Sequence, residues 1–91
     1  MTKDEYFMLL GKQKHAMDEL LKASRESRRA YDDLQSWLSD LQINKMDEQQ
    51  AFRGHSLIDQ LFKSKQSEAY WKAEEISARQ ALAGQANPPL E

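Results

Sequence analysis

Residues 2–42 decide the fold, and they read TKDEYFMLLGKQKHAMDELLKASRESRRAYDDLQSWLSDLQ. This stretch contains no proline and one glycine, Gly11. Its apolar residues recur at spacings of three and four, which is typical of a helix packed lengthwise against another helix. The recurring residues are Tyr6, Leu10, Met17, Leu20, Tyr31, Leu34, Leu38 and Leu41. Because a helix this long cannot bury its stripe alone, the rest of the chain must supply a packing partner.

The composition indicates an all-α protein. The 91 residues are enough for one domain at most. They include no valine, one threonine and three isoleucines, so the β-branched residues that favour strands are scarce. The net charge is -2 with both signs interspersed, which argues against an all-basic nucleic-acid binder and against a polyacidic tail. The absence of cysteine excludes a disulfide framework and a thiolate metal site.

Nothing in the sequence indicates a membrane protein. The longest apolar run, Tyr6 to Leu10, is far shorter than a membrane span. The charged residues Lys3, Asp4 and Glu5 at the start do not resemble a signal peptide. We therefore expect a cytoplasmic protein without a membrane partner.

A second helical stretch follows Asn44, which we predict as its N-cap with Asp47 at the third helical position. The second apolar stripe is Leu57, Ile58, Leu61, Phe62, Ala69, Ala73, Ile76 and Leu82. Gly54 leaves two alternatives open. A helix that runs through Gly54 gives a long antiparallel, coiled-coil-like helical hairpin, whereas a break there gives a three-helix arrangement.

The hairpin places residues whose numbers sum to roughly 89 or 90 opposite each other. The polar gap at Ser24 and Ser27 then meets the polar gap near Lys65, and this agreement supports the hairpin. We expect one helical domain over residues 1–84 and a flexible tail over residues 85–91, since Pro88 and Pro89 do not continue a helix. Leu90 and Glu91 resemble a remnant of cloning and are left out of the fold argument.

The polar residues do not assemble into a catalytic or metal site. His15 would lie near Glu74 and Glu75, but a structural metal site needs three or four converging ligands. Adjacent carboxylates such as Asp32 and Asp33 point about 100° apart on a helix, so they do not form an acid/base pair. We therefore expect no enzyme, no cofactor and no metal.

The surplus of large apolar residues is the main functional signal. More of them occur than a two-helix seam can hold, and tryptophan and tyrosine are favoured interface anchors. We predict a protein–protein interaction module, such as an adaptor, a chaperone-like partner or a small regulatory subunit. We expect its partner to be a helical protein, and we expect the chain to form a homodimer. The predicted partner-binding residues are Phe7, Leu9, Leu21, Trp37, Phe62, Tyr70 and Trp71.

A basic belt at mid-length supports the alternative function, a binder of nucleic acid or of an acidic partner. The hairpin would bring the residues of this belt to one level. They are Lys22, Arg25, Arg28, Arg29, Lys63 and Lys65. Nucleic acid is the weaker hypothesis, because nearby acids such as Asp32 and Glu68 can neutralise the belt and no aromatic residue interleaves with it.

Overall fold

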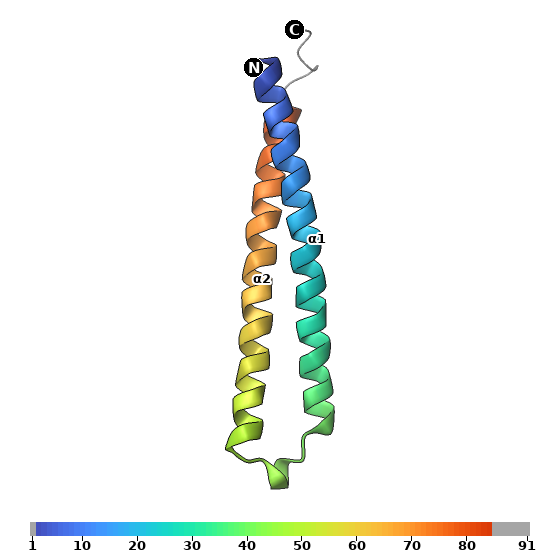
Figure 1. The fold of residues 1–91 in the computed structure, drawn as a ribbon, viewed down its shortest axis with the longest axis vertical. Helices are drawn as coiled ribbons and strands as arrows, with labels where there is room; N and C mark the ends of the chain where they lie inside the picture. The colour runs from blue at the N-terminus through green and yellow to red at the C-terminus, as the bar shows by residue number, and fades with distance from the viewer. Residues whose placement is uncertain (1, 85–91) are drawn as a thin grey trace.

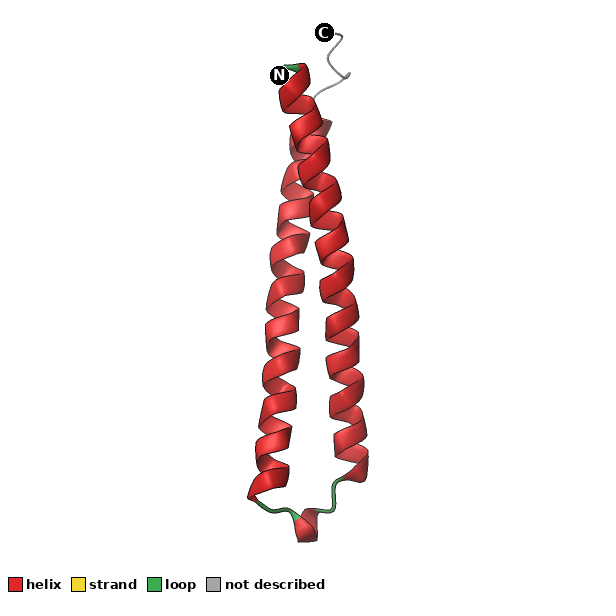
Figure 2. Cartoon of the chain, in the orientation of Figure 1, coloured by secondary structure: helices red, strands yellow, loops and turns green. Residues whose placement is uncertain are grey.

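The computed structural model describes residues 2–84. These residues form two long helices, α1 (Lys3–Asp40) and α2 (Glu48–Ala83), joined through a short 3-10 helix, η1 (Ile43–Lys45). The long helices lie side by side in an extended shape of 69 × 17 × 15 Å, and α2 runs back along α1 (Figure 1). Helix dominates the described range (Figure 2), so the predicted all-α class is confirmed.

The two helices begin at side-chain caps. The Thr2 hydroxyl accepts a hydrogen bond from the Glu5 amide, and the Glu5 carboxylate accepts one from the Thr2 amide, which completes a capping box. At α2 the predicted cap is wrong. Asp47, not Asn44, is the N-cap, because its carboxylate accepts a hydrogen bond of 2.9 Å from the Gln50 amide.

Gly54 lies inside α2, which continues without a break from Glu48 to Ala83. The three-helix alternative therefore does not apply to the described residues. The glycine allows close packing instead, since a Cβ at Gly54 would lie 2.5 and 2.7 Å from two ring carbons of Trp37. Gly11 differs, because no heavy atom outside its own helix backbone lies within 4 Å of a Cβ built there.

Small residues fill most of the fully buried positions of the seam between the helices. The buried residues are Ala16, Ala23, Ser27, Ala30, Gly54, Leu57 and Ala78. Three of these alanines lie seven residues apart on α1, an interval that keeps one face of a helix toward its neighbour. Half-buried Leu20, Leu34 and Trp37 continue the same line.

The predicted stripe of α1 is therefore wrong in part. Leu10, Met17, Tyr31 and Leu38 are between 37 % and 54 % exposed, and each follows a seam residue by one position. On α2, Ile58 and Phe62 are likewise exposed, at 53 % and 60 %. The physical reason is that alanine and glycine let the two backbones approach closely, so the larger side chains next to them no longer fit between the helices.

No helix in the described part of the chain is long and apolar enough to cross a membrane. The predicted tail, residues 85–91, lies outside the described residues.

The close contact at Gly54 predicts opposite effects for two glycine substitutions. Gly54→Ala gains about 1 kcal/mol of helix propensity, but the new methyl group overpacks against Trp37, which costs about 1–3 kcal/mol. We expect a net loss of stability in urea unfolding, and a smaller loss when Trp37→Leu makes room.

Gly11→Ala is the matched control, because its methyl group meets no neighbour. It should stabilise the protein by about 1 kcal/mol. Equal stabilisation by both substitutions would contradict the contact between Trp37 and Gly54.

Candidate interaction surfaces

The centre of the seam is polar. Ser27 is only 3 % exposed, and its hydroxyl makes no hydrogen bond of standard geometry. It faces Glu68 of α2, and this hydroxyl is the largest cause that lowers the pKa of the Glu68 carboxyl. Lys65, whose Nζ lies 3.2 Å from the Glu68 carboxylate, lowers this pKa further. Ser24 lowers it by less, and burial of the carboxyl raises it. Ser24 and Ser27 therefore lie level with Lys65 and Glu68, close to the predicted register.

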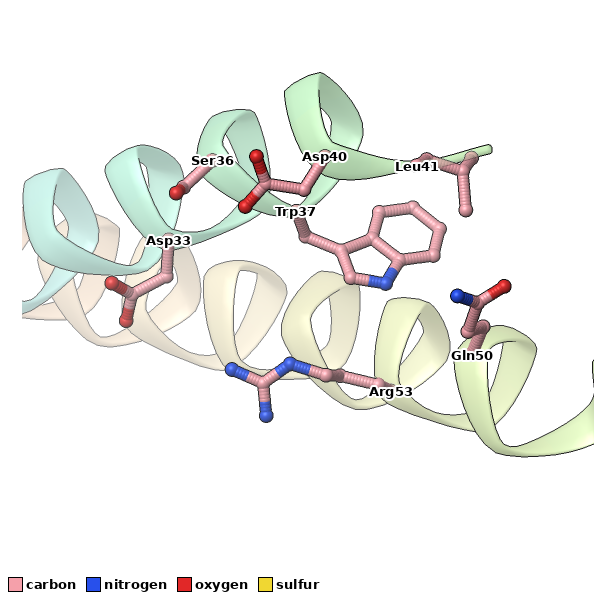
Figure 3. Close-up of a pocket in the computed structure, with 7 residues that line it drawn as sticks. All are labelled: Asp33, Ser36, Trp37, Asp40, Leu41, Gln50 and Arg53. Carbon is pink, nitrogen blue, oxygen red and sulfur yellow. The ribbon is translucent and has the colours of Figure 1, made fainter. Parts of the chain in front are cut away.

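A pocket lies next to the turn that joins the helices, and Trp37 is its largest side chain (Figure 3). The indole extends from α1 toward α2, where Gln50 and Arg53 line the other wall. The Gln50 side-chain oxygen is buried and has no hydrogen-bond partner. Asp33, Asp40 and Arg53 also line this pocket, and no ion pair joins them, so the pocket presents side chains of both charges.

A second pocket near the free ends contains His15, which the sequence places near Glu74 and Glu75. His15 shares it with Glu74, and its ring meets the Trp71 ring edge to face at 5.3 Å. Among the described residues no group of three histidine, aspartate or glutamate side chains could hold a metal ion. The histidine therefore contributes an aromatic contact between the helices.

The two sides of the helix pair differ in polarity. Arg28 and Tyr31 of α1 and Lys65 of α2 line one groove, and each follows a seam residue by one position. Residues at this offset on the two helices therefore face the same side, which we call the apolar face. Its large members are Phe7, Leu10, Met17, Leu21, Tyr31 and Leu38 from α1, and Ile58, Phe62 and Ile76 from α2. They make this side an apolar surface with no partner in the structure.

The opposite side is polar. Glu26, Arg29 and Asp33 of α1 and Gln60 and Lys63 of α2 line its central groove. Each of these residues precedes a seam residue by one position. The molecule therefore has one side suited to water and one side suited to an apolar partner.

The predicted partner-binding residues separate into two groups. Phe7, Leu21, Phe62 and Tyr70 are between 54 % and 60 % exposed and are free to contact another molecule. Leu9, Trp37 and Trp71 are half-buried in the seam. Tyr70 lies away from the apolar face, because it precedes the seam residue Trp71.

Seven residues of the apolar face belong to the stripes predicted from the sequence, namely Leu10, Met17, Tyr31, Leu38, Ile58, Phe62 and Ile76. On α1 the signal for the true seam is Ala16, Ala23 and Ala30, which repeat every seventh residue and directly precede Met17, Ser24 and Tyr31. An alanine line marks the side where helices approach closely, and this leaves the bulky neighbours outside.

The structure divides the predicted basic belt between the two sides. Arg28 and Lys65 line the groove of the apolar face, whereas Arg29 and Lys63 line the polar groove. Three members of the belt have acidic partners within their own helices. These pairs are Arg28–Asp32 at 3.6 Å, Lys63–Asp59 at 2.9 Å and Lys65–Glu68 at 3.2 Å. The belt is thus partly neutralised and does not form one continuous patch.

No protein-family model matches this sequence, and no curated protein or solved structure is significantly similar to it.

The lowered pKa of Glu68 predicts an acid-dependent loss of stability. A carboxyl whose pKa is lower in the folded state adds stability above its unfolded pKa, and that stability disappears as the pH falls through the folded pKa. Urea unfolding at about pH 6 and about pH 3 measures the difference. Glu68→Gln should reduce the difference, whereas Glu26→Gln on the solvated side should leave it close to wild type. An unchanged difference in Glu68→Gln would show that Ser27 and Lys65 do not favour the charged carboxylate.

Proposed function

We propose that this protein is a non-enzymatic protein–protein interaction module that binds a helical partner by packing helix faces together. α1 and α2 would serve as an antiparallel, coiled-coil-like hairpin, and the protein would act as an adaptor, a chaperone-like partner or a small regulatory subunit. A cytoplasmic location belongs to the same proposal, because a chain without cysteine suits a reducing compartment.

The observation that carries the proposal is the distribution of large apolar side chains. Thirteen of them among residues 2–84 are more than a third exposed, whereas Leu57 is the one large side chain among the buried residues. A monomer of this size gains little from such an arrangement, because apolar surface stabilises only when it leaves water. Eight of the thirteen lie on the apolar face, where a partner helix would bury them.

The alternative function, binding to nucleic acid or to an acidic partner, has weaker support. The positive residues of the basic belt lie on both sides of the molecule, and three of them have acidic partners. Phosphate binding requires cations that are free to replace the counterions of the nucleic acid.

Affinity capture with matched variants separates the two functions. Phe62→Ala removes an exposed aromatic side chain from the apolar face and should weaken partner binding by about 2 kcal/mol or more. The charge reversals Arg25→Glu and Arg29→Glu should leave the captured proteins unchanged. Circular dichroism serves as the control that all variants remain helical.

Two results would contradict the proposal. One is capture that survives Phe62→Ala but is lost with the charge reversals. The other is binding to a generic duplex or single strand that weakens steeply with salt, the signature of phosphate contacts.

A further inference from the structure

We propose that the partner of the apolar face is a second copy of this chain, laid end over end about a two-fold axis that passes over Ser24. This inference rests on the proposed function and specifies its partner. In the resulting assembly α1 would lie antiparallel on the partner's α1, and α2 on the partner's α2. The four helices would enclose both apolar faces.

The first argument is the symmetry of α1. Leu10 and Leu38 lie fourteen residues before and after Ser24, and Met17 and Tyr31 lie seven residues before and after it. All four are exposed on the apolar face. A two-fold axis at Ser24 therefore places large apolar residues on large apolar residues, and it places the small Ser24 on its own copy.

The symmetry of α2 has its centre at the same level. Ile58 and Ile76 of the apolar face lie nine residues before and after position 67. Position 67 is next to Glu68, and Ser24 and Glu68 line the same groove between the helices. One axis therefore serves both helices. The matched pairs would be Leu10 with the partner's Leu38, Met17 with the partner's Tyr31, and Ile58 with the partner's Ile76.

Charge selects this arrangement over the other two-fold arrangement. The charged residues that follow a seam position are all basic, namely Lys14, Arg28, Lys65, Lys72 and Arg79. If the axis ran parallel to the helices, α1 would lie on the partner's α2. Arg28 would then face the partner's Lys65, which is at its own level, and two positive groups would meet with only the acid of their own helix beside each of them.

The end-over-end arrangement separates these charges. Lys72 and Phe62 lie five residues from position 67 on opposite sides, so each Lys72 would meet the partner's Phe62 ring, a favourable cation–π geometry. Lys65 would meet the partner's Ala69 by the same count. Arg28 and Arg79 keep their own acidic partners, Asp32 and Glu75.

The area is sufficient for a stable dimer. The face extends over most of a molecule that measures 69 Å by 17 Å. A stable interface buries roughly 800 Å² on each partner, which is less than this face offers.

Cysteine cross-linking tests the position of the axis, and the chain has no native cysteine to interfere. Ser24→Cys should form a covalent dimer under mild oxidation, because each new thiol lies next to its own copy. Lys22→Cys, at the same level on the polar side, should not. Leu10→Cys and Leu38→Cys should cross-link efficiently only when the two variants are mixed.

A charge exchange tests the predicted pairing in solution. Met17→Glu should convert the dimer to a monomer, as measured by sedimentation, since Glu would be buried against the partner's Tyr31. Adding Tyr31→Lys should restore the dimer, because each Glu would then meet a partner's Lys. Lys22→Glu is the control on the polar side and should leave the mass unchanged.

Three results would overturn the inference: a monomeric wild-type protein at high micromolar concentration, a dimer without Ser24→Cys cross-linking, or no rescue by Tyr31→Lys. A monomer whose captured proteins are still lost with Phe62→Ala would leave the proposed function standing with a different partner. A monomer whose captured proteins are indifferent to Phe62→Ala would overturn both.

Discussion

The close approach of α1 and α2 depends on the small residues between them. Ala16, Ala23 and Ala30 repeat at the interval that keeps one helix face toward its neighbour, and Gly54 makes room for the Trp37 indole on the other helix. A small side chain brings two backbones near each other and gains dispersion contacts along the full length of the helices. The short distance between the two helices determines where the larger side chains can lie.

Its first consequence is the position of the large apolar residues. Leu10, Met17, Tyr31 and Leu38 lie beside the alanine line and remain outside it. The same offset on α2 points to the same side of the molecule, as the groove shared by Tyr31 and Lys65 demonstrates. The close packing of α1 and α2 therefore produces both a seam of small residues and an apolar face outside it. The proposed partner would bind to this apolar face.

The polar centre of the seam adds a further constraint. Ser27 and Glu68 occupy positions where apolar residues would give more stability, and the Ser27 hydroxyl, followed by Lys65, lowers the pKa of the Glu68 carboxyl. A slide of one helix along the other would separate the Ser27 hydroxyl from the Glu68 carboxylate that it faces. The register of the helices therefore depends on a few polar atoms as well as on the alanines.

Part of this structure was predictable from the sequence. The helical class, the cap at Thr2 and the level at which Ser27 meets the second helix follow from composition, capping chemistry and matching polar gaps. The seam itself did not follow, because two apolar stripes run side by side on α1 with the same spacing. An apolar stripe read from periodicity assigns the large residues Leu10 and Met17 to the seam before Ala16. Close packing of two helices favours the small alanine there instead. The N-cap of α2 is ambiguous in the sequence for a different reason. Asparagine and aspartate both suit an N-cap, so residue type alone does not separate Asn44 from Asp47.

For the interaction surface, the sequence indicated an apolar surplus but could not assign each residue to a side. In the structure Phe7, Leu21 and Phe62 are exposed, whereas Trp37 and Trp71 are half-buried, the first beside Gly54 and the second beside His15. That assignment depends on the three-dimensional neighbours of each ring, which residue spacing alone does not specify.

The most direct test of the alanine seam is a set of nuclear Overhauser contacts, with isotope filtering to separate contacts within one chain from those between chains. We expect the methyl groups of Ala16, Ala23 and Ala30 to contact α2 of their own chain, and the side chains of Leu10 and Leu38 to make no such contact. Contacts from Leu10 and Leu38 to α2 of the same chain, with Ala23 facing solvent, would contradict this expectation.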